Sequence, residues 1–142
     1  MTEQSFSKVL TANDTGASGG HQAGIHIPKT QKELIAFLPE LDPATKNPSV
    51  WLDCRDDAGG NWQFRYVYYN NKLHDSKGTR NEYRITHMTA FMRSVGARPG
   101  QMITISGVPR SGLLTLSVSD AGHQSDEHMP RRIRLKGWQR VY

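Results

Sequence analysis

The stretch "SVWLDCRDDAGGNWQFRYVYYN", residues 49–70, predicts a β-hairpin and with it the class of the fold. Its two halves, Ser49–Arg55 and Asn61–Asn70, are rich in β-branched and aromatic residues, and they flank a turn that contains two glycines, Asp56–Gly60. In the second half, aromatic residues recur at every second position and therefore share one face of a strand. These are Trp62, Phe64, Tyr66 and Tyr68. We expect the four rings to lie in the core.

Outside this hairpin, alternating apolar and polar residues predict further short strands. They cover Ser5–Leu10, Ala23–Pro28, 101–108, 113–120 and one or two basic strands within 131–142. Two short helices are expected, at Thr30–Pro39, where Thr30 and Glu33 have the spacing of a capping box, and at His87–Gly96. About seven strands that do not alternate regularly with helices exclude a doubly wound sheet and favour a mainly β fold, a small barrel or pseudobarrel.

The length of 142 residues is typical of one domain, residues 1–142, with a core of its own. The single cysteine, Cys54, excludes an internal disulfide and suits a reducing cytoplasm. No apolar run approaches the roughly 20 residues that a membrane helix requires, and the N-terminus lacks the pattern of a signal peptide. We therefore expect a cytoplasmic protein without a membrane partner.

The net charge of +5 is concentrated in the second half of the chain. Residues 1–71 hold six Lys/Arg and eight Asp/Glu, whereas residues 72–142 hold twelve and five. This asymmetry favours an anionic partner, most often nucleic acid, although a solvated basic face without any partner has the same composition.

The stretch "NDTGASGGHQAG", Asn13–Gly24, contains the Asp-Thr-Gly signature of an aspartic protease at Asp14. That chemistry needs two aspartates that share a proton in a dry site, and the motif normally follows two hydrophobic residues at the end of a strand. Here Asp14 follows Ala-Asn, so the protease is a weak alternative. The glycines are not followed by Lys-Ser/Thr, which makes a phosphate-binding loop weaker still.

The sequence shows no recognisable metal-binding or catalytic motif. The six histidines show no HExxH spacing, and one cysteine cannot build a structural zinc site. His123 and His128, with Asp126 and Glu127 between them, are more typical of a solvated loop than of an ion site. We expect no catalytic residue, no cofactor and no metal here, and hence a non-catalytic domain.

The stretch "KGTRNEYR", Lys77–Arg84, belongs to a polar, turn-rich connection over residues 70–86. Arginine can pair with guanine, asparagine with adenine, and glutamate can accept a hydrogen bond from the cytosine amine, whereas lysine and a second arginine suit phosphates. The glutamate favours sequence readout, because a non-specific binder of RNA or single strands would need cations alone. The other alternative is an ordinary charged loop with an Arg–Glu ion pair.

Four motifs that follow one another in the chain carry a family resemblance. "ANDTG-SGGHQ-G--IP" is followed by "NPSV-L", "YYN" and "TRNE-RIT", over roughly Phe6–Thr86. Together they resemble the N-terminal effector-binding domain of restriction endonucleases of the EcoRII and UbaLAI type. The resemblance implies a prokaryotic DNA-binding pseudobarrel, similar to the DNA-binding domains of plant auxin response factors, that recognises double-stranded DNA at a CCWGG-like site. It also implies that a separate nuclease domain, which would use Mg²⁺, is attached in the parent protein, and that the isolated domain is monomeric.

The same resemblance implies two arms that enter the major groove: the N-arm, Asn13–Gly24, and the C-arm, His74–Arg84. Residues in and beside the arms are the predicted DNA contacts. They are Lys8, Asp14, Ser18, His21, Gln22, His26, Lys77, Thr79, Arg80, Asn81, Glu82 and Arg84. Arg80 is expected to read guanine and Glu82 the cytosine amine, with further contacts from Asn81 and the N-arm.

Three cations in this set, Lys8, Lys77 and Arg84, are expected to hold phosphates. The chain departs from the family pattern at several positions. Its C-arm is one residue longer than the family stretch His-Phe-Gly-Lys-Thr-Arg, which displaces Lys77. The family has an aromatic residue at the position of His26 and a lysine at the position of Tyr83.

Overall fold

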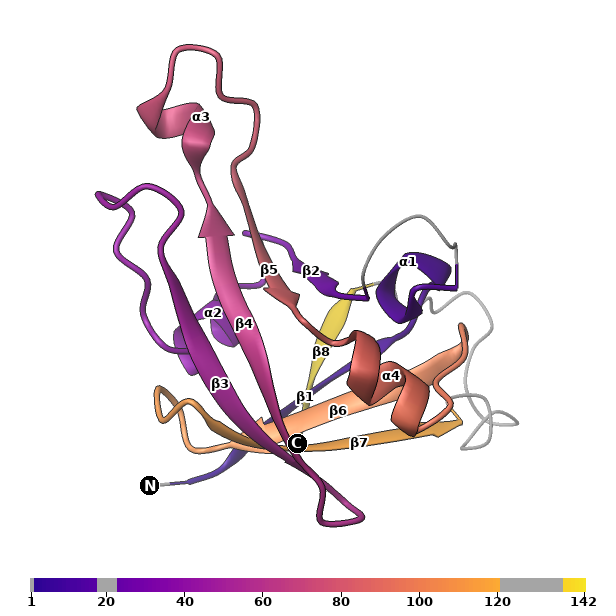
Figure 1. Cartoon of the computed structure of the whole chain (residues 1–142). Helices are drawn as coiled ribbons and strands as arrows, with labels where there is room; N and C mark the ends of the chain where they lie inside the picture. Colours follow the sequence, from indigo (N-terminus) through magenta and orange to yellow (C-terminus); the bar gives the residue numbers. More distant parts are fainter. Residues whose placement is uncertain (1, 18–22, 121–136) are drawn as a thin grey trace, which may run out of the picture.

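The computed structural model describes residues 2–17, 23–120 and 137–142, and its eight strands form one sheet that curls into a nearly closed barrel (Figure 1). The strand order is β2-β5-β4-β3-β7-β6-β1-β8. The strands are β1 Gln4–Val9, β2 Ile25–Ile27, β3 Ser49–Asp56, β4 Asn61–Tyr69, β5 Glu82–Thr86, β6 Gln101–Gly107, β7 Leu113–Asp120 and β8 Trp138–Val141. All neighbours pair antiparallel except β3 and β7, which are parallel. The mainly β prediction is confirmed.

Four short helices accompany the strands. They are α1 Ala12–Thr15, α2 Lys32–Phe37, α3 Asn71–His74 and α4 Thr89–Ser94. The expected capping box at Thr30 is wrong, because the N-cap of α2 is Gln31. The N–H of Gln31 donates to the carbonyl of Pro28, so residues 28–31 form a turn and α2 begins after it. None of the described helices is long and apolar enough to span a bilayer.

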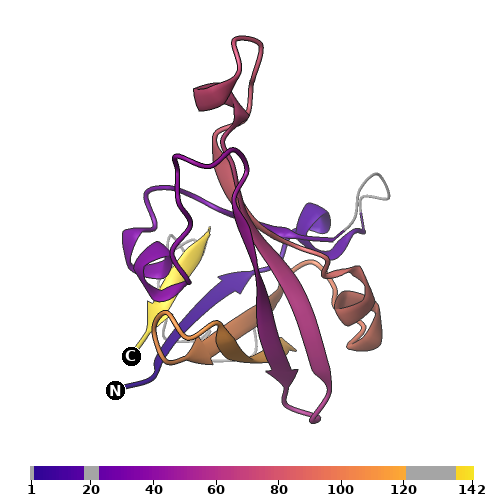
Figure 2. The same ribbon diagram turned by 60° about the vertical axis from the view of Figure 1, so that its left-hand side comes forward.

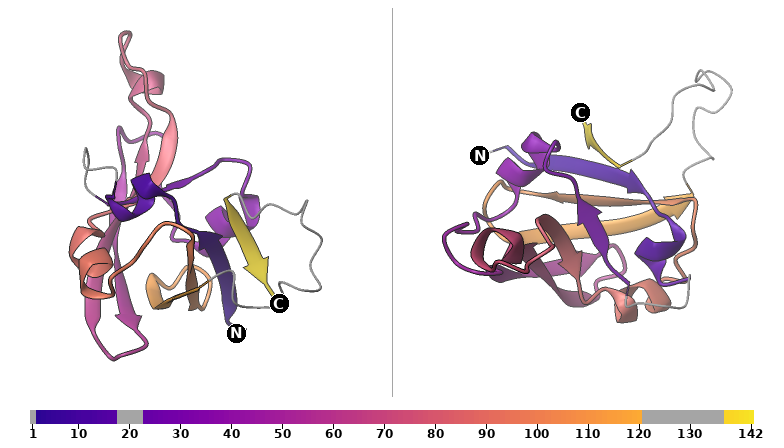
Figure 3. Two further views of the ribbon diagram at one scale, coloured as in Figure 1. Left: turned by 90° about the vertical axis from the view of Figure 1, so that its right-hand side faces the viewer. Right: turned by 90° about the horizontal axis from the view of Figure 1, so that it is seen from above.

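The aromatic residues of β4 fill the barrel interior as expected. Three of the four predicted rings are buried, and the fourth, Trp62, is partly buried against them. Phe91 of α4 packs edge-on against Trp62 and Phe64, with ring centroids 5.6 Å apart in each pair. Phe37 of α2 packs against Phe6 of β1 at 5.0 Å. The two helices therefore close the core from opposite sides, as Figures 2 and 3 show.

The two edge strands of the sheet, β2 and β8, approach each other on the far side of the barrel from β3. The indole N–H of Trp138 in β8 donates to the carbonyl of His26 in β2 over 3.3 Å. Trp138 is buried, so this contact holds the two edges together and nearly closes the barrel.

The connection over residues 70–86 was expected to consist of turns, and this expectation is wrong at both ends. It begins with α3 and ends in β5, which pairs with β4 on one side and β2 on the other. The charged residues of β5 conceal its alternation: Ile85 is buried and Tyr83 packs against the core, whereas Glu82 and Arg84 point to the outside of the barrel.

The turn between β3 and β4 is organised by one carboxylate, Asp56. Its side chain accepts hydrogen bonds from the backbone N–H groups of Ala58 and Gly60, at 2.9 and 2.7 Å, and from the indole N–H of Trp62 at 2.8 Å. The Trp62 bond, followed by the backbone bonds, lowers the pKa of Asp56 below its ordinary value of 3.8. The turn therefore depends on an ionised side chain.

We expect the stability of the fold to depend on Asp56 in acid. Because folding lowers the pKa of Asp56, its contribution is complete above the ordinary value and is lost as the pH falls through the native pKa. Asp56→Asn should flatten the decline of the free energy of unfolding between about pH 5 and pH 3, since an amide does not titrate. Urea unfolding over this range is the measurement. Asp57→Asn, which removes the same charge from the neighbouring exposed position, is the matched control, and equal slopes in the two variants would contradict the prediction.

Candidate nucleic-acid interface

The C-arm lies beyond the barrel, at the far ends of β4 and β5 (Figure 1). Two hydrogen bonds close its base: the N–H of Lys72 donates to the carbonyl of Arg80 over 3.0 Å, and the N–H of Arg80 donates to the side-chain oxygen of Asn71 over 2.8 Å. Gly78 packs so tightly on α3 that a Cβ there would lie 2.1 Å from the carbonyl oxygen of Asn71. The C-arm therefore requires a glycine at this point, and Lys77 beside it is exposed.

Three charged side chains stand on one outer face of the C-arm: Glu82 and Arg84 of β5, and Arg80 two residues before the strand, because alternate residues of an extended chain share a face. Arg80 and Arg84 both donate to the same oxygen of Glu82, over 3.1 and 3.2 Å. The three side chains are 42%, 29% and 31% exposed, in the order Arg80, Arg84, Glu82. They form an accessible array that we call the Arg-Glu-Arg array.

The carboxylate of this array is held in its charged form. Burial acts to raise the pKa of Glu82, but the hydrogen bonds and charges of Arg80 and Arg84 outweigh it, and the net effect is a lowered pKa. At neutral pH Glu82 is therefore purely an acceptor, and the array as a whole carries one net positive charge.

An aromatic ring that we had not predicted as functional completes the array. The guanidinium carbon of Arg80 lies 3.7 Å from the ring centroid of Tyr69, the residue that pairs with Glu82 across the ladder. Sequence reasoning missed Tyr69 because the neighbouring aromatics of β4 are core residues. The alternation itself could have identified it: Tyr69 directly follows the inward-facing Tyr68, so its side chain must point to the opposite, outer face of the strand.

Asn81, the residue before β5, points away from the Arg-Glu-Arg array. The hydroxyl of Tyr68 donates to the amide oxygen of Asn81 over 2.6 Å, and Tyr68 itself stacks on Tyr83 with ring centroids 4.2 Å apart. The three residues that are consecutive in "RNE" are thus divided between two faces, and one acceptor position of Asn81 is already occupied.

Asp14 and Lys8 lie inside the base of the N-arm. The ammonium of Lys8 pairs with the carboxylate of Asp14 at 2.5 Å, and both side chains are less than a tenth exposed. The same carboxylate accepts from the N–H of Thr11, whose hydroxyl accepts from the N–H of Asp14, so the two residues form a capping box for α1. An aspartic protease needs this carboxylate to face a second aspartate, whereas here it is buried against Lys8 and the N–H of Thr11, which argues against the protease.

The N-arm returns to the barrel beside the C-arm strand. The N–H of Ala23 donates to the hydroxyl of Thr89 over 3.0 Å, and Gly24 packs so closely on β5 that a Cβ would lie 2.8 Å from the carbonyl oxygen of Ile85. The next outward residue, His26, is exposed and pairs with Arg84 in the ladder. The pairing of β2 with β5 therefore places the end of the N-arm next to the Arg-Glu-Arg array.

The remaining predicted contacts divide into two groups. On the C-arm, Lys77 and Thr79 are exposed. Ser18, His21 and Gln22 of the N-arm lie outside the described residues.

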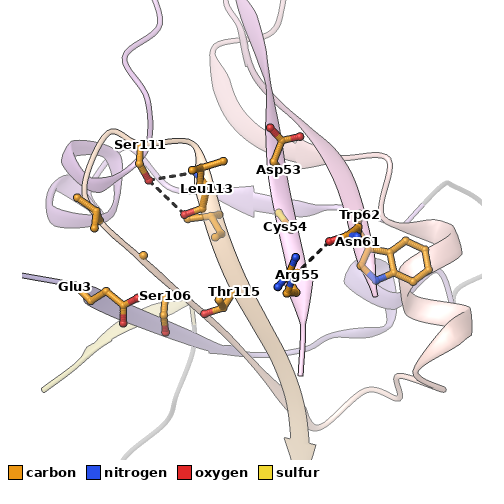
Figure 4. A pocket seen from close by; sticks show the side chains of 13 residues that line it. Glu3, Asp53, Cys54, Arg55, Asn61, Trp62, Ser106, Ser111, Leu113 and Thr115 are labelled. Atoms are coloured by element: carbon orange, nitrogen blue, oxygen red, sulfur yellow. Dashed lines mark hydrogen bonds between the residues drawn. The ribbon is translucent and has the colours of Figure 1, made fainter. Parts of the chain in front are cut away.

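A hollow of about 630 Å³ lies at the end of β4 opposite to the C-arm, where β3 and β7 pair (Figure 4). Cys54, Trp62 and Leu114 form part of its lining. Burial raises the pKa of the Cys54 thiol to about 12, so the thiol stays protonated and is not an activated nucleophile. Within residues 2–17, 23–120 and 137–142, no three His, Cys, Asp or Glu side chains gather as metal ligands, and His123 and His128 lie outside these ranges.

Comparisons with known proteins agree on one family and one fold. The model of the family described as "Restriction endonuclease EcoRII, N-terminal" matches residues 2–96. The type II restriction enzyme EcoRII of Escherichia coli is 43% identical over 89 residues, which are 57% of this chain and 20% of the relative. Auxin response factor 12 of Arabidopsis thaliana is 34% identical over 122 residues, which are 84% of this chain and 18% of the relative. The chain thus spans about a fifth of the length of these relatives.

A solved structure described as the Arabidopsis FUS3–DNA complex has the same fold. Its protein chain superimposes with a TM-score of 0.59 at 21% sequence identity, over 81% of this chain and 95% of that one.

Proposed function

The chain belongs to the family of EcoRII N-terminal domains, and from this premise we propose that it is a sequence-specific binder of double-stranded DNA, the effector-binding or target-recognition domain of a restriction endonuclease. The observation that carries the proposal is the Arg-Glu-Arg array, in which two guanidiniums and one ionised carboxylate are held together and partly exposed on a projecting arm.

The chemistry of the array matches the edges of guanine and cytosine. Arginine can donate two hydrogen bonds to O6 and N7 of guanine, and a carboxylate can accept from the N4 amine of cytosine. We infer that Arg80 reads guanine and Glu82 reads cytosine, while Arg84 binds a phosphate. Such partners suit a site of CCWGG type, in which G·C pairs flank a central A·T pair.

We infer further that the two arms grip one duplex in the major groove. The pairing of β2 with β5 supports this, since it places His26 beside Arg84 and the end of the N-arm beside the C-arm. Lys77 and Thr79 are exposed for contacts with the backbone of the duplex, and His21 and Gln22 would add contacts from the N-arm. Asn81 can still donate from its amide nitrogen.

Lys8 and Asp14 have a different part in this proposal. Because their ion pair is buried at the base of α1, we infer that they support the N-arm from within. A phosphate contact by Lys8 would require this pair to open.

For the parent protein, we propose that residues 1–142 form one non-catalytic domain and that a nuclease domain with its own Mg²⁺ is attached to it. The restriction enzyme EcoRII of Escherichia coli, about a fifth of which aligns with this chain, supports the proposal. We propose the bacterial cytoplasm as its location and a monomer as the state of the isolated domain.

Binding to defined duplexes tests the proposal. In a gel-shift titration with unlabelled competitor, a CCWGG duplex should bind about a thousandfold more tightly than an unrelated duplex, and exchange of one G·C pair should weaken binding about 5- to 150-fold. Equal affinity for all duplexes would contradict sequence readout and favour the alternative, a non-specific basic binder. Stronger binding to single strands or RNA than to any duplex would do the same.

A further inference from the structure

The ring of Tyr69 contacts the flat face of the Arg80 guanidinium and leaves N–H donors at the edge of the guanidinium free. The 3.7 Å separation between the guanidinium carbon and the ring centroid places the cation over the face of the ring. In the same side chain, one terminal nitrogen bonds Glu82 over 3.1 Å. A guanidinium has five N–H donors in its plane, so stacking through the face and one bond to a carboxylate leave donors available for a planar partner such as guanine.

The backbone that carries this ring is fixed by its neighbours in β4. Tyr68, on one side, is buried and its N–H bonds the carbonyl of Pro48 over 3.0 Å. Asn70, on the other side, is fully buried and bonded to the loop that precedes β3. Tyr69 pairs directly with Glu82 across the ladder. The backbone at Tyr69 is therefore held on both sides, and it gives the ring a rigid base beside an otherwise projecting arm.

A ring on a rigid base can order Arg80 before DNA binds. This matters because a free arginine side chain loses much rotational freedom when it binds a base edge. If the side chain is already ordered in the free protein, less of this entropy is lost on binding, and affinity for the correct base rises. Contacts with phosphate do not need the same precision, since they fix position without reading sequence.

We propose that Tyr69 is a positioning residue that orders Arg80 for base readout, a proposal that rests on the proposed function. Tyr69 does this by stacking, and its hydroxyl is not required. The effect of the ring acts through Arg80, so it concerns the cognate duplex and leaves the affinity for unrelated duplexes unchanged.

The test compares Tyr69→Leu, which removes the ring and keeps an apolar side chain, with Tyr69→Phe, which keeps the ring and removes the hydroxyl. We expect Tyr69→Leu to weaken binding to the CCWGG duplex about 3- to 30-fold and Tyr69→Phe to change it less than about twofold, with both variants binding an unrelated duplex like the parent chain. Trp51→Leu, which removes an exposed ring from the same face of the sheet, is the matched control and should bind both duplexes like the parent.

A double substitution separates positioning from a structural effect. In the Arg80→Ala background, Tyr69→Leu should cause no further loss of cognate binding, because the side chain that it positions is absent. A further loss equal to that of the single variant would overturn the proposal, as would an equal loss on both duplexes accompanied by a lower melting temperature. If the parent chain itself does not discriminate between duplexes, the proposed function fails; if the parent and Arg80→Ala behave as expected but Tyr69→Leu binds like the parent, only the positioning proposal fails.

Discussion

Replacing Arg80 by alanine should weaken binding to a CCWGG duplex about 5- to 150-fold, equivalent to about 1–3 kcal/mol. The loss of affinity should come only from the missing side chain, because the backbone groups of residue 80 make the hydrogen bonds that hold the C-arm together. The N–H of Arg80 bonds the side chain of Asn71, and its carbonyl accepts from the N–H of Lys72. Both bonds survive in Arg80→Ala, so the C-arm should keep its conformation.

Titration by gel shift or fluorescence anisotropy against cognate, single-exchange and unrelated duplexes measures this effect. Arg55→Ala removes the same charge from an exposed position at the opposite end of the hairpin and is the matched control. It should bind the cognate duplex within about twofold of the parent, since an isolated surface charge far from the arms contributes little. Cognate binding by Arg80→Ala that equals that of Arg55→Ala would refute the role of Arg80 in readout.

Replacing Asn70 by alanine should lower the free energy of unfolding by about 2–4 kcal/mol. The change leaves backbone groups of the loop before β3 without the hydrogen-bonding partner that the Asn70 amide provides. Asn70 is fully buried at the end of β4. Its amide nitrogen donates to the carbonyls of Pro43 and Thr45, at 3.2 and 2.9 Å, and its amide oxygen accepts from the N–H of Asn47 at 2.6 Å. Asn47 returns the contact, since its side chain accepts from the N–H of Asn70 over 3.0 Å.

Urea unfolding at neutral pH measures this loss. Asn61→Ala, at the exposed beginning of the same strand, should stay within about 0.5 kcal/mol of the parent and is the matched control. Asn70→Asp keeps the acceptor but points a carboxylate at two carbonyls, so it should be as destabilising as alanine at neutral pH and recover partly in acid, when the protonated carboxyl can donate again. An unfolding energy of Asn70→Ala equal to that of Asn61→Ala would show that water replaces the lost bonds.

The Asn47–Asn70 pair also gives two short motifs of this chain a structural role. "NPSV-L" contains Asn47 and "YYN" contains Asn70, and the side chains of both asparagines are used in hydrogen bonds within the fold. Their hydrogen bonds tie the end of β4 to the loop before β3. The motifs could be recognised from sequence, but their joint role could not, because the two asparagines are more than twenty positions apart.

Alternation was a reliable guide wherever one face of a strand is apolar. It predicted the hairpin of β3 and β4 and the rings that fill the barrel, because burial of one face follows directly from a period of two. It failed at β5, where the outward positions are charged and only Tyr83 and Ile85 face inward. It could not detect α1 and α3, since helices of four residues are too short to show a periodic pattern.

By itself the sequence determined the mainly β class, the aromatic core and, through its motifs, the family, since all three depend on residue types at short spacings. Only the tertiary structure decided how the polar residues of the two arms are used. In the structure Lys8 is buried with Asp14, Asn81 points away from the Arg-Glu-Arg array, and the ring of Tyr69 lies against the guanidinium of Arg80. Those outcomes depend on which strands pair and in which register, and register is set by the burial of the whole sheet rather than by neighbours in the chain. The pairing of β2 with β5 places Gly24, at the end of the stretch "NDTGASGGHQAG", beside the strand that continues from "KGTRNEYR", and no spacing within the chain predicts that proximity.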